Sequence, residues 1–159
     1  FIAAQPNASE ITYAVGGGGH TGFFNNKYIK RLDERGLPDD ELTSPLNYRV
    51  IRWSDVLLMA AEAFQRSGND GRARTELNKV RGRVSMPAVN SSGDALYQAI
   101  LNERRFELSG EGYRFFDLVR TGQAANRING FVTGKHELFP IPQVEIDLAG
   151  GIWNQNPGY

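Results

Sequence analysis

Two amphipathic segments joined by a very short connection constrain the fold of this chain more than any other feature. The first begins near Ser54, a predicted N-cap, and its apolar residues recur at helical spacing as far as Phe64. The second begins at Asn69 or Asp70, and its apolar residues repeat at steps of four, three and four: Ala73, Leu77, Val80 and Val84. Gly68 lies between the segments, where glycine favours a helix end. Two helices with so short a connection must lie antiparallel.

This hairpin has the design of a tetratricopeptide repeat, because small residues at positions 60, 61 and 63 permit close approach of the second helix. One hairpin cannot bury its apolar face alone, so further helices are expected beside it. We predict a third helix over about 94–108, since Ser91 and Asp94 have capping-box spacing. A short fourth helix is predicted over about 113–120, and residues 143–148 could form one turn. The predicted fold is mainly α, with a helical hairpin, further short helices and long irregular loops.

Residues 1–47 differ from the rest, because they show no sustained helical period and contain the run Gly16–Gly19, which resists regular structure. We expect a loop-rich segment here and a helical domain over residues 48–159. The segment either packs on the surface of the helical body or faces a ligand. The chain opens on Phe1 without a methionine, so we expect it to be a piece of a longer protein, with any targeting sequence lost with the front end.

Composition excludes several classes of function. The 18 basic and 18 acidic side chains cancel, whereas a nucleic-acid-binding protein needs a basic excess to neutralise phosphates. The absence of cysteine excludes disulfides and thiolate metal sites. His20 and His136 lie too far apart in the sequence to form a helical metal pair. We therefore predict no metal, no cofactor and no nucleic-acid partner.

A charged stretch at 103–120 is the most suggestive of catalysis. Glu103 and Glu107 continue the helix face that holds Leu96 and Ile100, so two carboxylates extend an apolar stripe. One interpretation is an acid/base pair, as in a glycoside hydrolase. The other is a structural ion-pair network, favoured because the stretch holds four acids and four arginines. The members predicted for this network are Glu103, Arg104, Glu107, Arg114, Asp117 and Arg120.

Five blocks of the sequence resemble the SusD/RagB family of nutrient-binding lipoproteins. Residues 52–63 resemble its Arg-Tyr-Ala-Asp-Val-Leu-Leu-Met-Tyr-Ala-Glu-Ala block, and residues 77–83 its Asn-x-Val-Arg-x-Arg block. Residues 103–120 are similar to its Glu-Arg-x-x-Glu-Leu, Glu-Gly-x-Arg and Asp-Leu-x-Arg signature. Residues 139–142 and 155–159 are similar to its closing blocks. The order of the blocks identifies the chain as the C-terminal part of such a protein.

The resemblance implies a non-enzymatic protein with tetratricopeptide-like hairpins. It implies an N-terminal lipid anchor, absent from this chain, in the outer membrane of Bacteroidetes, with the protein facing outward. The implied partners are an oligosaccharide and a SusC-like TonB-dependent transporter. Two alternatives are a glycan-degrading enzyme that uses Glu103 and Glu107 and a tetratricopeptide scaffold that binds only protein.

The family blocks contribute to the fold, so the resemblance identifies no ligand residue. Sugars bind exposed aromatic faces beside amides and acids, and on that ground the candidates within residues 1–47 are His20, Phe23, Phe24, Asn25 and Asn26. The competing interpretation is that Phe23 and Phe24 are buried.

Overall fold

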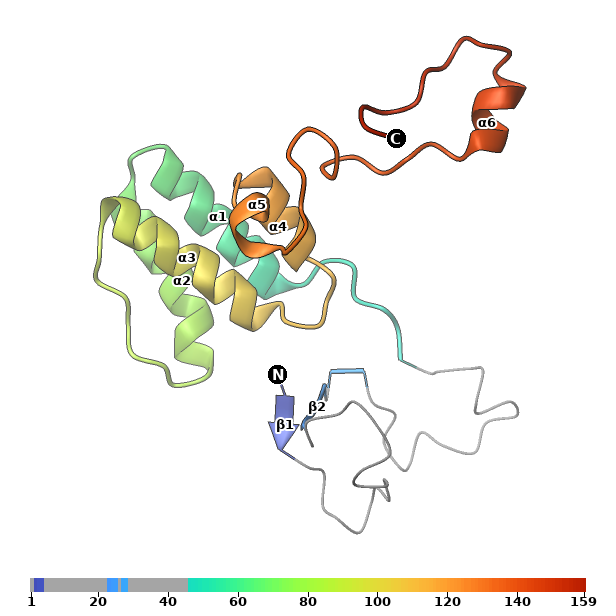
Figure 1. The fold of residues 1–159 in the computed structure, drawn as a ribbon. Helices are drawn as coiled ribbons and strands as arrows, with labels where there is room; N and C mark the ends of the chain where they lie inside the picture. Colours follow the sequence, from blue (N-terminus) through green and yellow to red (C-terminus); the bar gives the residue numbers. More distant parts are fainter. Residues whose placement is uncertain (1, 5–22, 26, 29–45) are drawn as a thin grey trace, which may run out of the picture. The chain divides into compact units, whose positions relative to one another are not determined.

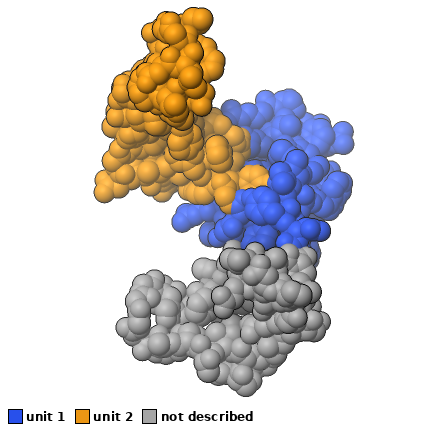
Figure 2. Space-filling model, turned by 90° about the vertical axis from the view of Figure 1, so that its right-hand side faces the viewer, with its two compact units in different colours: residues 1–111 blue, residues 112–159 orange. Residues whose placement is uncertain are grey.

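The computed structural model describes residues 2–4, 23–25, 27–28 and 46–159. The chain divides into two compact units, residues 1–111 and residues 112–159, which Figure 2 shows in different colours. Each unit is described here by itself. The expected division into a loop-rich segment 1–47 and a helical domain 48–159 stays a prediction, because most of residues 1–47 lie outside the described part of the chain.

The first unit is built on the predicted helical hairpin. Helix α1 spans Trp53–Arg66 and helix α2 spans Asp70–Arg83, and the two pack side by side (Figure 1). Gly68 makes the turn with a φ of 79°, a value that favours glycine. Its N–H donates to the Gln65 carbonyl at 3.0 Å, and the Asn69 N–H donates to the Phe64 carbonyl at 2.8 Å. The Asn69 side chain then accepts from the Arg72 N–H at 3.1 Å, which caps α2.

Helix α3, Gly93–Glu107, packs against both helices of the hairpin and closes the core. The three helices contribute small and branched aliphatic side chains, each of them at most 6% exposed: Leu57, Leu58, Ala61, Ala73, Leu77, Val80, Leu96 and Ile100. The helical periods seen in the sequence therefore identified most of this core. Leu58 was missed, and Val56 and Ala63, which share a helical period on the first helix, are exposed. Together with the further short helices, this arrangement confirms the mainly α fold.

Three details of the helix ends were predicted wrongly. Arg52 is the N-cap of α1, so Ser54 lies inside the helix. The capping box from Ser91 is wrong, because Ser92 precedes α3 and the Asp70 carboxylate accepts the Gly93 N–H at 2.7 Å. Val84 follows the last residue of α2 and is 36% exposed, so it does not extend the apolar stripe. In each case a contact from another element, or the end of the helix, decides the outcome.

A short antiparallel pair of strands lies in the N-terminal part of the first unit. Strand β1, Ile2–Ala4, pairs with β2, Phe23–Asn25, and Ala3 lies opposite Phe24. The sequence did not predict these strands, because three-residue strands are too short to show an alternating pattern.

The second unit contains α4, Arg114–Arg120, α5, Ala124–Arg127, and α6, Gln143–Leu148. The short fourth helix and the turn at 143–148 were predicted, whereas the four residues of α5 are too few to give a helical period. Rings surround Phe115, whose centroid lies 5.6 Å from that of Phe116, 6.5 Å from that of Phe131 and 6.1 Å from that of Phe139. No helix in the described part of the chain is both long and apolar enough to cross a bilayer.

Within the second unit, side chains of the C-terminal residues 155–159 bind backbone atoms of residues 138–141. The Gln155 amide accepts from the Ile141 N–H and donates to the Ile141 carbonyl, both at 2.8 Å. Asn156 donates to the Phe139 carbonyl at 2.6 Å, and the Tyr159 hydroxyl donates to the Leu138 carbonyl at 3.0 Å. The two closing blocks of the sequence thus bind each other.

We predict that Leu77→Ala lowers the free energy of unfolding by about 2–5 kcal/mol, because Leu77 is fully buried among three helices and the change leaves a cavity. Leu148→Ala is the matched control, since Leu148 is 77% exposed. It should change stability by less than about 0.5 kcal/mol. Urea unfolding followed by circular dichroism measures both, and equal losses would contradict the assignment of the core.

Candidate functional site

A dense set of charges within the described part of the first unit surrounds Arg52, the N-cap of α1. Its guanidinium donates to both carboxylate oxygens of Glu111, from Nε at 2.8 Å and from Nη2 at 2.9 Å. The same group donates from Nη1 to Glu107 Oε1 at 2.5 Å, and it also contacts the Glu107 carbonyl and the Ser54 hydroxyl. One guanidinium therefore joins the start of α1 to the end of α3 and to the turn that follows it.

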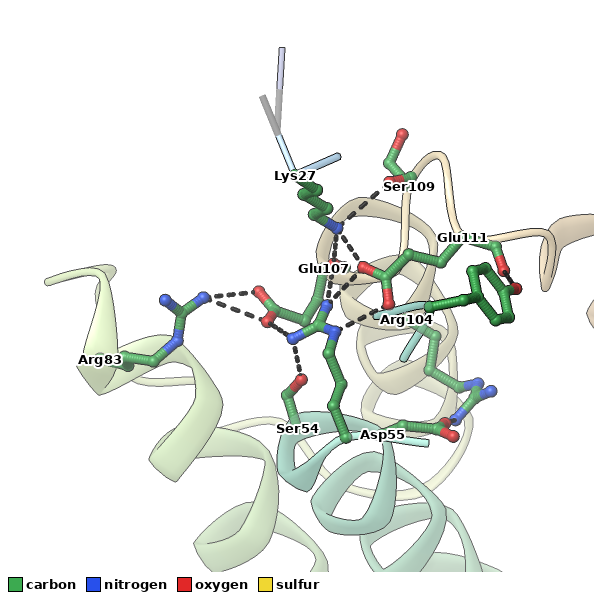
Figure 3. Close-up of polar contacts among 10 residues, drawn as sticks. Lys27, Ser54, Asp55, Arg83, Arg104, Glu107, Ser109 and Glu111 are labelled. Atoms are coloured by element: carbon green, nitrogen blue, oxygen red, sulfur yellow. Dashed lines mark hydrogen bonds and ion pairs between the residues drawn. The ribbon is translucent and has the colours of Figure 1, made fainter. Parts of the chain in front are cut away.

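Lys27 reaches the same place from the N-terminal part of the chain (Figure 3). Its ammonium forms an ion pair with the Glu111 carboxylate and donates to the carbonyls of Glu107 at 2.6 Å and Ser109 at 3.1 Å. Glu111, only 4% exposed, thus meets two cations, and the Tyr48 hydroxyl donates to its carbonyl at 3.3 Å. The turn after α3 is held by side chains from two distant segments.

Two arginines of α2 complete the pairing on the other side. Arg81 donates from Nη1 to Glu103 Oε2 at 2.6 Å and from Nε to the Pro87 carbonyl at 2.8 Å. Arg83 Nη2 donates to both oxygens of Glu107, at 3.1 Å and 2.9 Å. Each carboxylate on the buried face of α3 therefore has a guanidinium partner from outside α3.

The remaining contacts explain why the matched blocks contain certain other polar residues. Arg104 is buried and donates to Asp55 Oδ1 at 2.7 Å, which joins α3 to the first turn of α1. Asn78 uses its amide to hold Val89, accepting from its N–H at 2.8 Å and donating to its carbonyl at 3.0 Å. The Asn-x-Val-Arg-x-Arg pattern thus contains a loop contact, a core valine and two carboxylate partners.

In the second unit, Asp117 and Arg120 pair within α4 at 2.8 Å, three residues apart. Arg114 is the first residue of that helix. The network predicted for residues 103–120 assumed partners inside that stretch, but Glu103, Glu107 and Arg104 have partners on α2 and at the start of α1. Sequence reasoning missed Lys27, Arg52, Asp55, Arg81 and Arg83 as partners. It counted Glu111 among the four acids of the stretch but did not name it as a member of the network. Among the missed partners, Arg52, Arg81 and Arg83 lie in the blocks 52–63 and 77–83. Their place in these blocks is the feature of the sequence that could have identified them as partners.

The network lowers the pKa of two of its carboxyl groups. Burial alone raises the pKa of Glu107, but the hydrogen bond and charge of Arg52 and the charge of Arg83 outweigh it, so the pKa lies below its usual value. Burial also raises the pKa of Glu111, and Arg52 and Lys27 outweigh it in the same way. The two glutamates in turn raise the pKa of Arg52 despite its burial. All three groups are ionised at neutral pH, where Glu107 therefore has no proton to donate as a general acid.

Two hollows adjoin the network. One, of about 590 Å³, has a mainly apolar surface, with Val84, Met86 and Phe106 beside the Arg81–Glu103 pair. The other, of about 300 Å³, is lined by Lys27, Tyr28, Arg49, Arg52, Arg83, Glu107 and Glu111. In the described part of the chain, no group of three histidine, aspartate or glutamate side chains is arranged to hold a metal ion.

The candidate sugar contacts stay a prediction. His20 and Asn26 lie outside the described residues. Phe23, Phe24 and Asn25 form strand β2, and only their backbone is described. The structure therefore does not decide between a ligand-facing and a buried position for the two phenylalanines.

Comparison with known proteins places these features in a family. The model of the SusD family matches residues 9–159. A SusD-like protein of Formosa agariphila is 40% identical over 108 residues, which cover 60% of this chain and 21% of that protein. A second SusD-like protein of the same organism is 31% identical over 135 residues, which cover 73% of this chain and 26% of that protein. The chain thus spans about a quarter of the length of these relatives.

Solved structures agree with the sequence matches. A SusD homolog from Bacteroides thetaiotaomicron has a TM-score of 0.65 and 36% identity, covering 70% of this chain and 25% of that one. A SusD superfamily protein from Parabacteroides distasonis has a TM-score of 0.61 and 29% identity, covering 76% of this chain and 29% of that one.

We predict that Arg52→Met lowers the free energy of unfolding by about 3 kcal/mol, because it leaves two buried carboxylates short of their shared partner. Lys79→Met is the control, since it breaks an ion pair with Glu76 whose lysine is 52% exposed. That change should cost less than about 1 kcal/mol. Urea titration of both variants at pH 7 gives the comparison, and similar losses would show that the network contributes little.

Stability should also fall in acid. A carboxyl group with a lowered pKa in the folded state stabilises the protein fully above its unfolded pKa, near pH 4.3 for glutamate, and this stabilisation disappears as the pH falls through the folded pKa. We therefore expect a constant contribution near neutral pH and a progressive loss below about pH 4.3. The dependence should be shallower in Arg52→Met, because the cation that lowers both pKa values is missing. Equal slopes in the two proteins, measured by urea unfolding at each pH, would refute this assignment.

Proposed function

The chain belongs to the SusD family, and from this we propose that the whole protein is a non-enzymatic binding lipoprotein that captures oligosaccharides. In this proposal it is anchored by an N-terminal lipid to the outer membrane, faces the outside, and delivers its ligand to a SusC-like TonB-dependent transporter. Membership of the family carries the proposal, because the family model and two SusD-like proteins each match most of this chain.

The state of the carboxylates supports a binding role over a hydrolytic one. An acid/base pair needs one carboxyl group that is protonated near neutral pH. Glu107 instead has two guanidinium partners and a pKa below its usual value, and Glu103 has a guanidinium partner at 2.6 Å. Buried carboxylates neutralised in this way hold helices together, which accounts for their position on the core face of α3.

An exposed apolar stripe on α1 supports a scaffold role for the hairpin. Trp53, Val56 and Met59 recur at steps of three and are 71%, 37% and 46% exposed. Helical hairpins of the tetratricopeptide type bury such stripes by stacking on neighbouring hairpins. We propose that another hairpin of the whole protein covers this stripe, and that the ligand is bound by loops.

The test is oligosaccharide binding by the whole protein, measured by a glycan array and then by isothermal titration calorimetry. We expect at least one oligosaccharide to bind in a saturable way. A scaffold that binds only protein would give no carbohydrate signal, and that result would contradict the proposal.

Chromatography of each bound oligosaccharide before and after long incubation tests the enzymatic alternative. We expect the oligosaccharide to stay intact with the unchanged protein. Hydrolysis that disappears in Glu103→Gln or Glu107→Gln, while circular dichroism shows the variant still folded, would establish the enzyme and overturn the proposal.

A further inference from the structure

The 300 Å³ hollow beside the ion-pair network has a lining that the network itself does not explain. Among the described residues, four cationic side chains line it against two anionic ones, so this described lining carries an excess of two positive charges. A purely structural network is expected to balance its charges, as the pairs of Arg81 with Glu103 and Arg104 with Asp55 do. The hollow that holds this excess charge can be reached from solvent beside Arg83, whose side chain is 58% exposed.

Two of the four cations have hydrogen-bonding capacity left for a ligand. Arg83 uses only Nη2 in its contact with Glu107, so its other two nitrogens can donate elsewhere. Arg49 is exposed and forms no ion pair with any residue that the structure describes. A guanidinium suits the geometry of a carboxylate or sulfate, because two parallel N–H donors match two oxygens.

Aromatic side chains lie beside these cations. The rings of Tyr28 and Tyr48 stack at 5.9 Å between centroids, and Tyr48 is 64% exposed. Burial and then the charge of Glu111 raise the pKa of Tyr28, so its hydroxyl stays protonated and can donate a hydrogen bond. An exposed aromatic face next to polar groups is the combination that holds a sugar ring, with the ring on the apolar face and its hydroxyls on the polar groups.

We propose that this hollow binds the oxyanion group of an acidic oligosaccharide, with Arg49 and Arg83 on the oxyanion and the Tyr28–Tyr48 stack beside the sugar ring. The oxyanion is the carboxylate of a uronate or a sulfate ester, and both groups present a pair of oxygens that can accept two parallel N–H bonds from a guanidinium. The volume of about 300 Å³ is at the lower end of ligand pockets and suits one acidic residue of a longer chain. The inference rests on the proposed function and names its class of ligand.

The experiment is calorimetric titration of the whole protein with matched pairs of oligosaccharides. Oligogalacturonate and oligomannuronate are each compared with their carboxyl-reduced counterparts, and a carrageenan oligosaccharide with its desulfated counterpart. We expect at least one acidic member to bind at least tenfold more tightly than its neutral counterpart, and the difference to shrink as salt is added. Binding of neutral oligosaccharides alone would overturn the inference and leave the proposed function intact, whereas no binding of any oligosaccharide would overturn both.

Variants then locate the site. Arg49→Gln should weaken binding of the acidic oligosaccharide about tenfold, because one charged hydrogen-bonding group is lost. It should leave the unfolding curve unchanged, since Arg49 pairs with no described residue. Arg105→Gln is the control, because Arg105 is an exposed arginine of α3 in the same unit that does not line the hollow. Equal affinities of the unchanged protein and Arg49→Gln, or equal losses in both variants, would place the acidic ligand elsewhere and refute the site.

Inorganic sulfate distinguishes a saccharide site from a site for a free anion. We expect sulfate to compete with the acidic oligosaccharide only at concentrations far above those at which the oligosaccharide binds, because sulfate cannot use the tyrosine stack. Sulfate that bound as tightly as every acidic oligosaccharide would contradict the assignment of the hollow to a saccharide.

Discussion

A single guanidinium shared by two buried carboxylates holds the helical unit together. Arg52 lies at the start of α1, Glu107 at the end of α3 and Glu111 in the turn beyond it, so the contacts join segments more than fifty residues apart. Burying Glu107 and Glu111 without partners would cost several kcal/mol for each charge. The connection between the start of α1 and the end of α3 therefore depends on the geometry around Arg52. Lys27 and Arg83 bind the same two glutamates, and Ser54 contacts Arg52 itself.

The sequence predicts the helices well because their apolar periods are local. Leu57, Leu77 and Ile100 each belong to a repeat that one helix displays by itself, so the core could be named before any tertiary contact was known. The outcome at helix ends depends on other elements. The Asp70 carboxylate takes the N–H that a capping box would have used at Gly93, and no spacing within residues 91–94 reveals that.

The charged site was predictable in kind but not in pairing. The position of Glu103 and Glu107 on an apolar helix face requires neutralising partners, and this requirement can be read from the sequence. Which arginine supplies the charge depends on how three helices pack. Arg81 and Arg52, both inside matched blocks, supply it in place of the arginines that follow Glu103 in the chain. Residues that contact a ligand could not be deduced, because the matched blocks build the fold.

The amide of Asn78 occupies both backbone groups of Val89, and that of Gln155 does the same for Ile141. These hydrogen bonds are made to main-chain atoms, so they do not depend on which side chains the restrained loop carries. Neither amide can be exchanged for the corresponding acid, because a carboxylate has no hydrogen for the carbonyl. Exposed side chains of these two loops can therefore be substituted without breaking either attachment.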